Sequence, residues 1–194
     1  DVPATSQVHN QLVRKAADNR VIELRPPVRL CFVKVREPDM NEPSGDLRRL
    51  IEALETQWPE RVSGPVSCDL HVMQQLQMVL RKGNWTVTIA LRTGCHIVAV
   101  WPGLKDQILG AAVDVGSTTM SAHICDMNDG TVLASTGIMN PQIRFGEDLM
   151  SRVSYGIMNK GGTAEMTEAV CEGLQQLIAG GAKQAGFTAD DVLE

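Results

Sequence analysis

The sequence lacks the features that mark three broad classes of protein. Its 194 residues contain no apolar run close to the roughly 20 residues that a membrane-spanning helix needs. Residues 1–10 lack the charged and apolar segments of a signal peptide. The formal net charge of -5 provides no broad basic surface for nucleic acid or for an anionic membrane. We therefore expect a cytoplasmic protein with no nucleic-acid or membrane partner.

Clustered cysteines are also absent. The five cysteines are far apart in the sequence, and no two of them form a Cys-x-x-Cys pair. An odd number at such spacing is typical of reduced thiols and argues against a disulfide framework or a zinc site. The four histidines are equally scattered. We interpret both residue types as structural groups.

The composition allows one hydrophobic core or two small ones, since 43% of the 194 residues are hydrophobic. Residues 1–26 begin as a polar segment that leads into Arg25-Pro26-Pro27, where two prolines exclude a regular helix, so we predict a linker over 1–26. Residues 188–194 resemble a turn that leads into another strand. We expect the chain to be a fragment of a longer protein.

Alternation and helical periodicity predict a βααββ unit over residues 27–107. A strand over 28–35 precedes two helices, near 46–58 and 69–82, in which apolar residues recur on one face. After residue 84 the period changes to two, and Arg92-Thr93-Gly94 is typical of a hairpin turn. Nothing in this unit predicts catalysis. We interpret its tryptophans as core residues: Trp58, Trp85 and Trp101.

A second unit is predicted over residues 108–194. It opens with three strands joined by tight turns, which form an antiparallel meander. A helix follows, with Leu149, Val153 and Ile157 as its buried stripe. A longer helix begins after Gly161-Gly162, and Gly180-Gly181 is expected to weaken its end by about 1 kcal/mol per glycine.

The first turn of the meander has the chemistry of a phosphate site. A buried strand ends near Asp114, and Gly116 lets a ligand approach the backbone. Ser117, Thr118 and Thr119 add hydroxyl donors for phosphate oxygens. Asp114 accepts hydrogen bonds only, so its presence favours a Mg²⁺ ion or its water shell between the carboxylate and the phosphate.

These residues carry a family resemblance. The order strand, Asp-x-Gly-Ser-Thr-Thr, strand, turn, strand and helices resembles the opening half of an actin-like, ribonuclease-H-like ATPase domain. The string NPQIRFGEDLMSRVSYG, Asn140 to Gly156, resembles the C-terminal domain of the reductive activators of corrinoid proteins. The resemblance implies an α/β chain: a linker over 1–26, an α+β middle domain over 27–107, and the truncated N-terminal half of an actin-like domain over 108–194.

The resemblance also implies a function. Members of that family look like iron-sulfur ATPases that return the cobalt of a corrinoid methyltransfer protein from Co(II) to Co(I). The implied cofactors are ATP, Mg²⁺ and a [2Fe-2S] cluster in an upstream ferredoxin domain that this chain does not contain. The implied partners are a corrinoid protein of a methyltransferase system and an electron donor, and a homodimer stays open. The fragment alone is expected to be inactive.

Carried onto this sequence, the resemblance assigns Asp114 as the catalytic residue that orients Mg²⁺ or its water. It assigns Gly116 and residues 117–119 to the terminal phosphates. A second set of cofactor-binding candidates comes from the family-like string: Arg144, Asp148 and Arg152. Asp148 and Arg152 stand at i and i+4, so their alternative interpretation is a structural ion pair that fixes the loop.

Two other functions stay open on the sequence alone. One is another actin-like ATPase or a small-molecule kinase, with residues 27–107 as a substrate domain. The other is a non-catalytic interaction module with a degenerate nucleotide half-site. An upstream sequence without ferredoxin cysteines would favour the first of these over a corrinoid activator.

Overall fold

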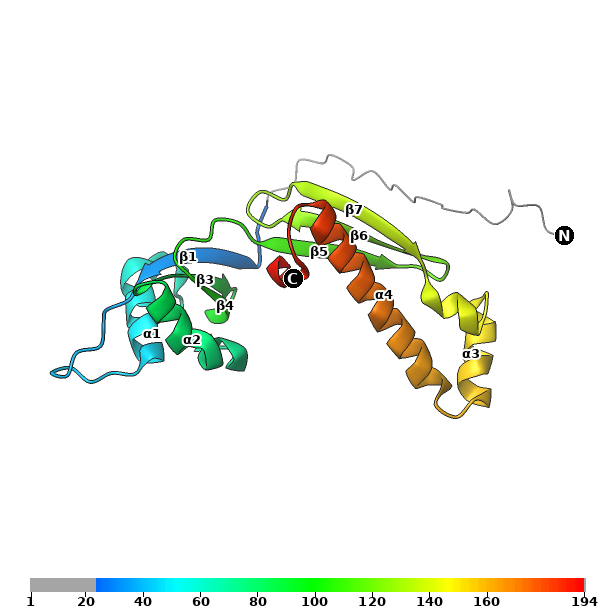
Figure 1. Ribbon diagram of the computed structural model, residues 1–194, viewed down its shortest axis with the longest axis horizontal. Coiled ribbons are helices and arrows are strands. Elements are labelled where there is room, and N and C mark those ends of the chain that lie inside the picture. Colours follow the sequence, from blue (N-terminus) through cyan, green and yellow to red (C-terminus); the bar gives the residue numbers. More distant parts are fainter. Residues whose placement is uncertain (1–23, 194) are drawn as a thin grey trace. The chain divides into compact units, whose positions relative to one another are not determined.

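The computed structural model describes residues 24–193, which divide into two compact units between Ile108 and Leu109 (Figure 1). Each unit combines helices with a β-sheet, which confirms the predicted α/β class. Residues 1–23 of the predicted linker lie outside the described residues. The two units are described separately below.

The first unit is a four-stranded sheet with two helices. In chain order its elements are β1 (Val28–Lys34), α1 (Asp46–Gln57), the 3-10 turn η2 (Pro59–Arg61), β2 (Ser67–Cys68), α2 (Leu70–Lys82), β3 (Thr86–Arg92) and β4 (His96–Pro102). The sheet order is β1-β3-β4-β2, and only β2 runs parallel to its neighbour. The predicted βααββ order is confirmed, with β2 as an additional strand of two residues.

Both helices pack on one face of this sheet because their apolar residues recur at helical spacing. Leu50 and Leu54 of α1 and Leu80 of α2 are fully buried against β1 and β3 side chains such as Val33 and Ile89. Burial of each such side chain contributes about 1.5–3 kcal/mol. Two of the predicted core tryptophans pack against the edge of this cluster: Trp58 and Trp85.

The end of α2 depends on Gly83. A Cβ atom at this position would lie 2.1 Å from the carbonyl oxygen of Thr86, so no other residue fits without a backbone shift. The Gly83 amide donates to Val79 at 2.9 Å and the Thr86 amide to Gly83 at 3.0 Å, which turns the chain directly from the helix into β3. The predicted end of this helix near residue 82 is confirmed.

The second unit is a three-stranded sheet followed by two helices. Its elements are β5 (Leu109–Val115), β6 (Thr119–Asp126), β7 (Val132–Met139), the 3-10 turn η3 (Pro141–Phe145), α3 (Leu149–Met158), α4 (Gly162–Gln184) and the 3-10 turn η4 (Ala189–Asp191). The strands pair antiparallel in the order β5-β6-β7, which confirms the predicted meander. Val192 forms a parallel bridge to Leu109, and the Leu193 amide donates to the Leu109 carbonyl at 2.9 Å.

Helix α4 packs on the sheet through small residues (Figure 1). A Cβ atom at Gly181 would lie 2.8 Å from Cγ1 of Ile124, and one at Gly173 would lie 3.0 Å from Cγ of Pro141. Gly181 therefore lets the helix approach the sheet closely, and Gly173 lets it approach η3. The expected helix-weakening effect did not include this role. Gly180, by contrast, has no atom within 4 Å of such a Cβ.

The predicted buried stripe of α3 is wrong. Leu149, Val153 and Ile157 are 67%, 45% and 80% exposed, whereas Arg152 is the one buried residue of this helix. Periodicity identified an apolar face correctly, but α3 packs on the unit through the side that carries Arg152.

The expectation of a buried first strand also fails in part, because β5 lies at the sheet edge and both Asp114 and Val115 are exposed.

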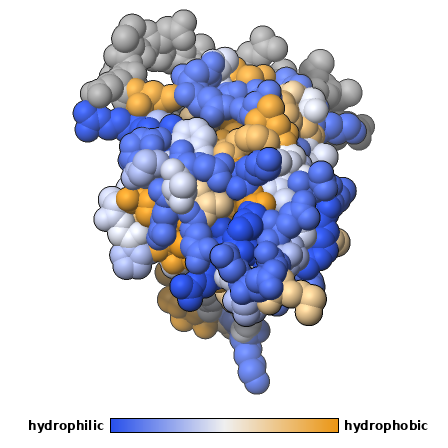
Figure 2. All heavy atoms as spheres, turned by 90° about the vertical axis from the view of Figure 1, so that its left-hand side faces the viewer, coloured by the Kyte–Doolittle hydropathy of each residue, from blue (hydrophilic) through white to orange (hydrophobic). Residues whose placement is uncertain are grey.

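The described surface is mainly hydrophilic on the face that Figure 2 shows, and hydrophobic residues form separate patches there. No described helix is both long enough and apolar enough to cross a membrane. All five cysteines are free thiols. Within residues 24–193, no group of three or more His, Cys, Asp or Glu side chains converges on a metal-sized site.

Candidate functional site

The turn between β5 and β6 is a tight backbone loop that requires glycine. The Gly116 amide donates to the Thr119 carbonyl at 2.9 Å and closes the loop. A Cβ atom at Gly116 would lie 2.7 Å from that same carbonyl oxygen. Because real Cβ atoms do not approach a backbone oxygen this closely, a side chain here would force the loop open.

Three successive carbonyl groups of this turn are held by residues from other elements. The Gly116 carbonyl accepts a hydrogen bond from Asn140 Nδ2 at 2.7 Å, and the Thr118 carbonyl accepts one from the Asn140 amide at 2.8 Å. The Ser117 carbonyl accepts from Arg152 Nη2 at 2.6 Å. Hydrogen bonds to these three carbonyl oxygens therefore fix the conformation of the turn.

This anchoring sets the direction of the backbone donors. In a planar trans peptide the N–H points away from the C=O of the same unit. Since the Gly116 and Ser117 carbonyls point to Asn140 and Arg152, the amides of Ser117 and Thr118 point to the opposite side. Neither amide has a hydrogen-bond acceptor among the described residues. Consecutive outward amides form an anion-binding concavity.

Arg152 gives this concavity a positive charge on its inner side. The residue is 5% exposed, and it donates through Nε to the Gly146 carbonyl at 2.9 Å in addition to its bond with Ser117. Its charge also acts on the nearby Asp148 carboxyl group, whose pKa it helps to lower. Arg152 therefore acts as a positioning residue that holds the turn, and its charge favours an anion nearby.

Asp148 caps a helix in addition to its electrostatic interaction with Arg152. Its Oδ1 accepts a hydrogen bond from the Ser151 amide at 2.7 Å and caps the N-terminus of α3. This backbone hydrogen bond lowers the pKa of the Asp148 carboxyl group. Arg144 is exposed, and its guanidinium carbon lies 4.8 Å from the Phe145 ring centroid.

Asp114 and Thr119 lie on the same face of the β5–β6 hairpin. Asp114 pairs with Ser121, and Thr119 lies two residues before Ser121 on β6. The opposite face carries Met120 and Ala122, which pack under α4. The carboxylate and the hydroxyl therefore face away from the hydrophobic core of this unit.

Asn140 is a site residue that the sequence analysis named only as the first residue of the family-like string. It is 2% exposed, and its Oδ1 accepts from the Gln142 amide at 2.9 Å, as a cap would. Its second bond, to the Gly116 carbonyl, depends on strand register: Thr119 pairs with Met139, which places residue 140 beside the turn. A meander with known register would have predicted this contact.

The residues present fit a magnesium-bound phosphate group. The outward amides of Ser117 and Thr118 supply donors, and their hydroxyls make no hydrogen bond within the described residues. Asp114 supplies the carboxylate oxygen that Mg²⁺ prefers. The described cysteines do not fit an iron-sulfur cluster, since none of them gathers with other metal-ligating side chains.

Known proteins match both units of the chain. The family model described as the RACo linker region matches residues 17–107, and the one described as the RACo middle region matches residues 109–194. The corrinoid activation enzyme RamQ from Eubacterium limosum is 30% identical over 150 residues, which are 76% of this chain and 24% of RamQ. The chain belongs to the RACo family.

A solved structure agrees with this assignment. The chain matches a reductive activator for corrinoid, iron-sulfur protein with a TM-score of 0.70 and 26% identity, over 89% of this chain and 28% of that structure's chain. The chain thus spans about a quarter of the length of these two relatives. The family descriptions apply the names linker and middle to residues 17–107 and 109–194, where the sequence analysis used middle domain and actin-like half-domain.

Proposed function

We propose that this chain is part of an ATP-dependent reductive activator, which returns the cobalt of a corrinoid protein from Co(II) to Co(I). The electron would come from a [2Fe-2S] domain outside residues 1–194. Support comes from the RACo family membership and from the two relatives, whose names describe corrinoid activation and reductive activation for a corrinoid, iron-sulfur protein. The partners would be a corrinoid protein and an electron donor, in the cytoplasm.

The observation that carries the ATPase part is the anchored turn at Gly116. Its carbonyls are bound by Asn140 and Arg152, so its amides are available to an anion on the exposed side. The chain also returns through α4 to lie parallel beside β5 at Val192, a connection of the kind found in α/β sheets. Both features support the assignment of residues 108–194 to the first half of an actin-like nucleotide domain.

In this proposal each residue of the turn has a distinct task. The amides of Ser117 and Thr118 donate to the terminal phosphate oxygens, and the hydroxyls of residues 117–119 add donors. Asp114 orients Mg²⁺ or one of its water ligands. Arg152 keeps the turn in place through the Ser117 carbonyl. Bound ATP would supply the differential affinity that shifts the protein between two conformations and couples it to electron transfer.

The test uses the full reading frame that contains this sequence. We expect a ferredoxin-type visible spectrum, ATP binding, and ATP-dependent formation of Co(I) in a corrinoid protein, measured by its absorbance. Asp114→Ala should abolish ATP binding. Asp129→Ala is the matched control, because Asp129 is an exposed aspartate in the other hairpin turn of the same sheet. A colourless full-length protein, or equal ATP binding in both variants, would refute the proposal.

A further inference from the structure

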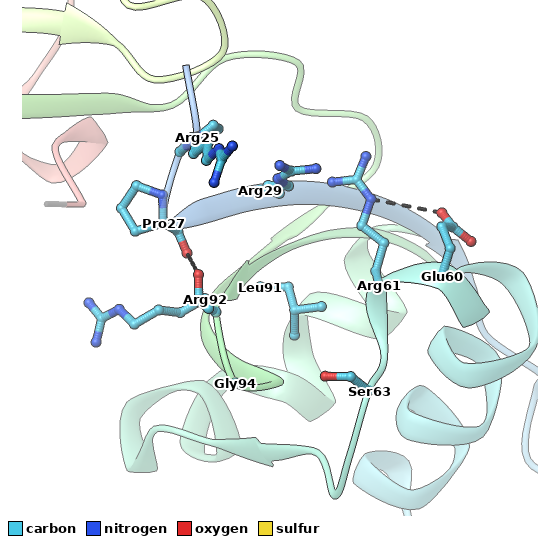
Figure 3. Close-up of a pocket in the computed structure, with 11 residues that line it drawn as sticks. Arg25, Pro27, Arg29, Glu60, Arg61, Ser63, Leu91, Arg92 and Gly94 are labelled. Carbon is cyan, nitrogen blue, oxygen red and sulfur yellow. Dashed lines mark hydrogen bonds and ion pairs between the residues drawn. The ribbon is translucent and has the colours of Figure 1, made fainter. Parts of the chain in front are cut away.

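The first unit contains a basic pocket that the proposed function does not use. Its volume is about 330 Å³, and it lies where the segment before β1, strand β1, turn η2 and the β3–β4 hairpin meet (Figure 3). Four arginines line it together with a single acidic residue, Glu60. The arginines come from separate segments of the chain: Arg25, Arg29, Arg61 and Arg92.

The charge distribution of the chain makes this concentration unusual. Residues 109–194 carry 4 Lys and Arg against 11 Asp and Glu, a net charge of -7. Residues 24–108 carry 11 Lys and Arg against 9 Asp and Glu, a net charge of +2. The pocket thus collects four of the eleven basic residues of its unit around one cavity. Like charges repel, so an anion in the cavity near Arg29 and Arg61 would stabilise the arrangement of these two guanidinium groups.

Glu60 offsets little of the charge of Arg61. Its carboxylate lies 3.8 Å from Arg61 Nε, which is the far limit of an ion pair, and its side chain is 63% exposed. An exposed pair of this kind contributes little. The Arg61 guanidinium lies instead 5.2 Å from the Trp58 ring centroid, which orients its planar fork while leaving its N–H donors at the rim.

The walls of the pocket are held by backbone contacts. The Pro27 carbonyl accepts hydrogen bonds from the Thr93 amide at 2.8 Å and from Thr93 Oγ1 at 3.1 Å. Arg29 lies on β1 opposite Leu91 of β3, and Figure 3 shows Leu91 beneath the row formed by Arg29 and Arg61. The arginines therefore project from fixed backbone positions, and a preorganised site binds with a smaller entropic cost.

We propose that this pocket binds a small molecule that carries at least two oxyanion groups, either phosphates or carboxylates. The planar guanidinium fork matches both groups through paired N–H···O bonds. The volume lies at the lower end of the range for small-molecule sites, which favours a compact metabolite-sized anion over a protein segment. Ser63 takes no part, because its amide and its hydroxyl both lie against Cys95 Sγ.

The experiment titrates the 194-residue chain with inorganic pyrophosphate and with citrate, and measures binding by calorimetry at constant ionic strength. One or both anions should bind, more weakly as salt is raised. Arg29→Gln/Arg61→Gln should weaken binding about 100-fold, because it removes two charge-assisted contacts. Arg36→Gln/Arg48→Gln is the control: it removes the same charge from exposed ion pairs of the same unit, and should change binding less than about 3-fold.

Two further variants keep the proposal falsifiable. If the glutamine pair does not fold, Arg29→Lys/Arg61→Lys retains the charge but removes the fork, and should weaken binding about tenfold. Gly116→Ala alters the proposed ATP site in the other unit and should leave citrate binding unchanged. Failure of the anion-pocket proposal can therefore be told apart from failure of the ATP-site proposal. Absence of binding at millimolar anion, equal weakening in the control pair, or binding of an acidic peptide alone would overturn the proposal.

Discussion

Replacement of Arg152 by methionine tests whether this buried cation holds the phosphate turn. Methionine keeps much of the aliphatic stem but removes the hydrogen bonds to the Ser117 and Gly146 carbonyls. Hydrogen bonds from a charged donor contribute about 1.5–3 kcal/mol each. Removing a buried cation also relieves part of its desolvation cost. We therefore expect the second unit to lose about 2–3 kcal/mol of unfolding free energy.

The tryptophan distribution provides a built-in reference for this measurement. Trp58, Trp85 and Trp101 all belong to residues 24–108, whereas the single tyrosine, Tyr155, lies on α3. Tryptophan fluorescence during urea unfolding thus reports the first unit alone. Amide hydrogen exchange of β5, β6 and α3 reports the second unit. The variant should shift the second signal and leave the first unchanged.

Arg144→Met is the matched control, since this exposed arginine contacts the Phe145 ring and should change the unfolding free energy by no more than about 1 kcal/mol. In the full-length protein, Arg152→Met should also weaken ATP binding. The Gly116 and Asn140 amides donate to the Thr119 and Thr118 carbonyls of the turn, so their hydrogen exchange reports whether the turn is held. Equal exchange of these two amides in the wild type and in Arg152→Met would refute the idea that this residue fixes the turn.

Three further predictions concern single positions. Gly116→Ala should destabilise the second unit by about 1–3 kcal/mol through its backbone clash, measured by urea unfolding followed by far-UV circular dichroism. Gly181→Ala should lower the unfolding free energy by a similar amount in the same measurement. Gly180→Ala lies one residue earlier, in open space, and should instead stabilise α4 by about 0.5–1 kcal/mol. Equal effects of the two substitutions would contradict the close packing at Gly181. The hydrogen bond with His96 lowers the pKa of the Asp69 carboxyl group below its ordinary value of 3.8. The ionised carboxylate therefore stabilises the fold fully above pH 3.8, and this stabilisation is lost as the pH falls through the lower pKa of the folded state. Tryptophan-detected stability should fall less steeply in acid for Asp69→Asn, and an unchanged slope would rule out this linkage.

Much of the fold was predictable because local signals agreed with each other. The helix near residues 69–82, the hairpin turn at Arg92-Thr93-Gly94 and the alternating strands each follow from a short local pattern, and the structure has them as expected. Strand β2 was missed because two residues show no alternation. The α3 face was misjudged because periodicity reveals an apolar stripe but does not identify the neighbour that covers it.

The residue types of the candidate site could be predicted from the sequence, but the residues that hold the turn in place could not. Gly116 and the hydroxyl residues form one continuous motif, so their proximity follows from the sequence. Asn140 and Arg152 approach the turn from 24 and 35 residues further along the chain. Those contacts depend on strand register and on the direction of α3, which no local pattern encodes.

The parallel bridge between Val192 and Leu109 bears on how the edge strand β5, which carries Asp114, could hold a ligand. A strand that begins at Val192 would run in the same direction as β5, so the carboxyl ends of both strands would reach the same rim of the sheet. In open α/β sheets, ligands bind outside the carboxyl ends of the strands. Asp114 lies next to the last residue of β5, so its carboxylate stands at the rim where this rule expects a ligand.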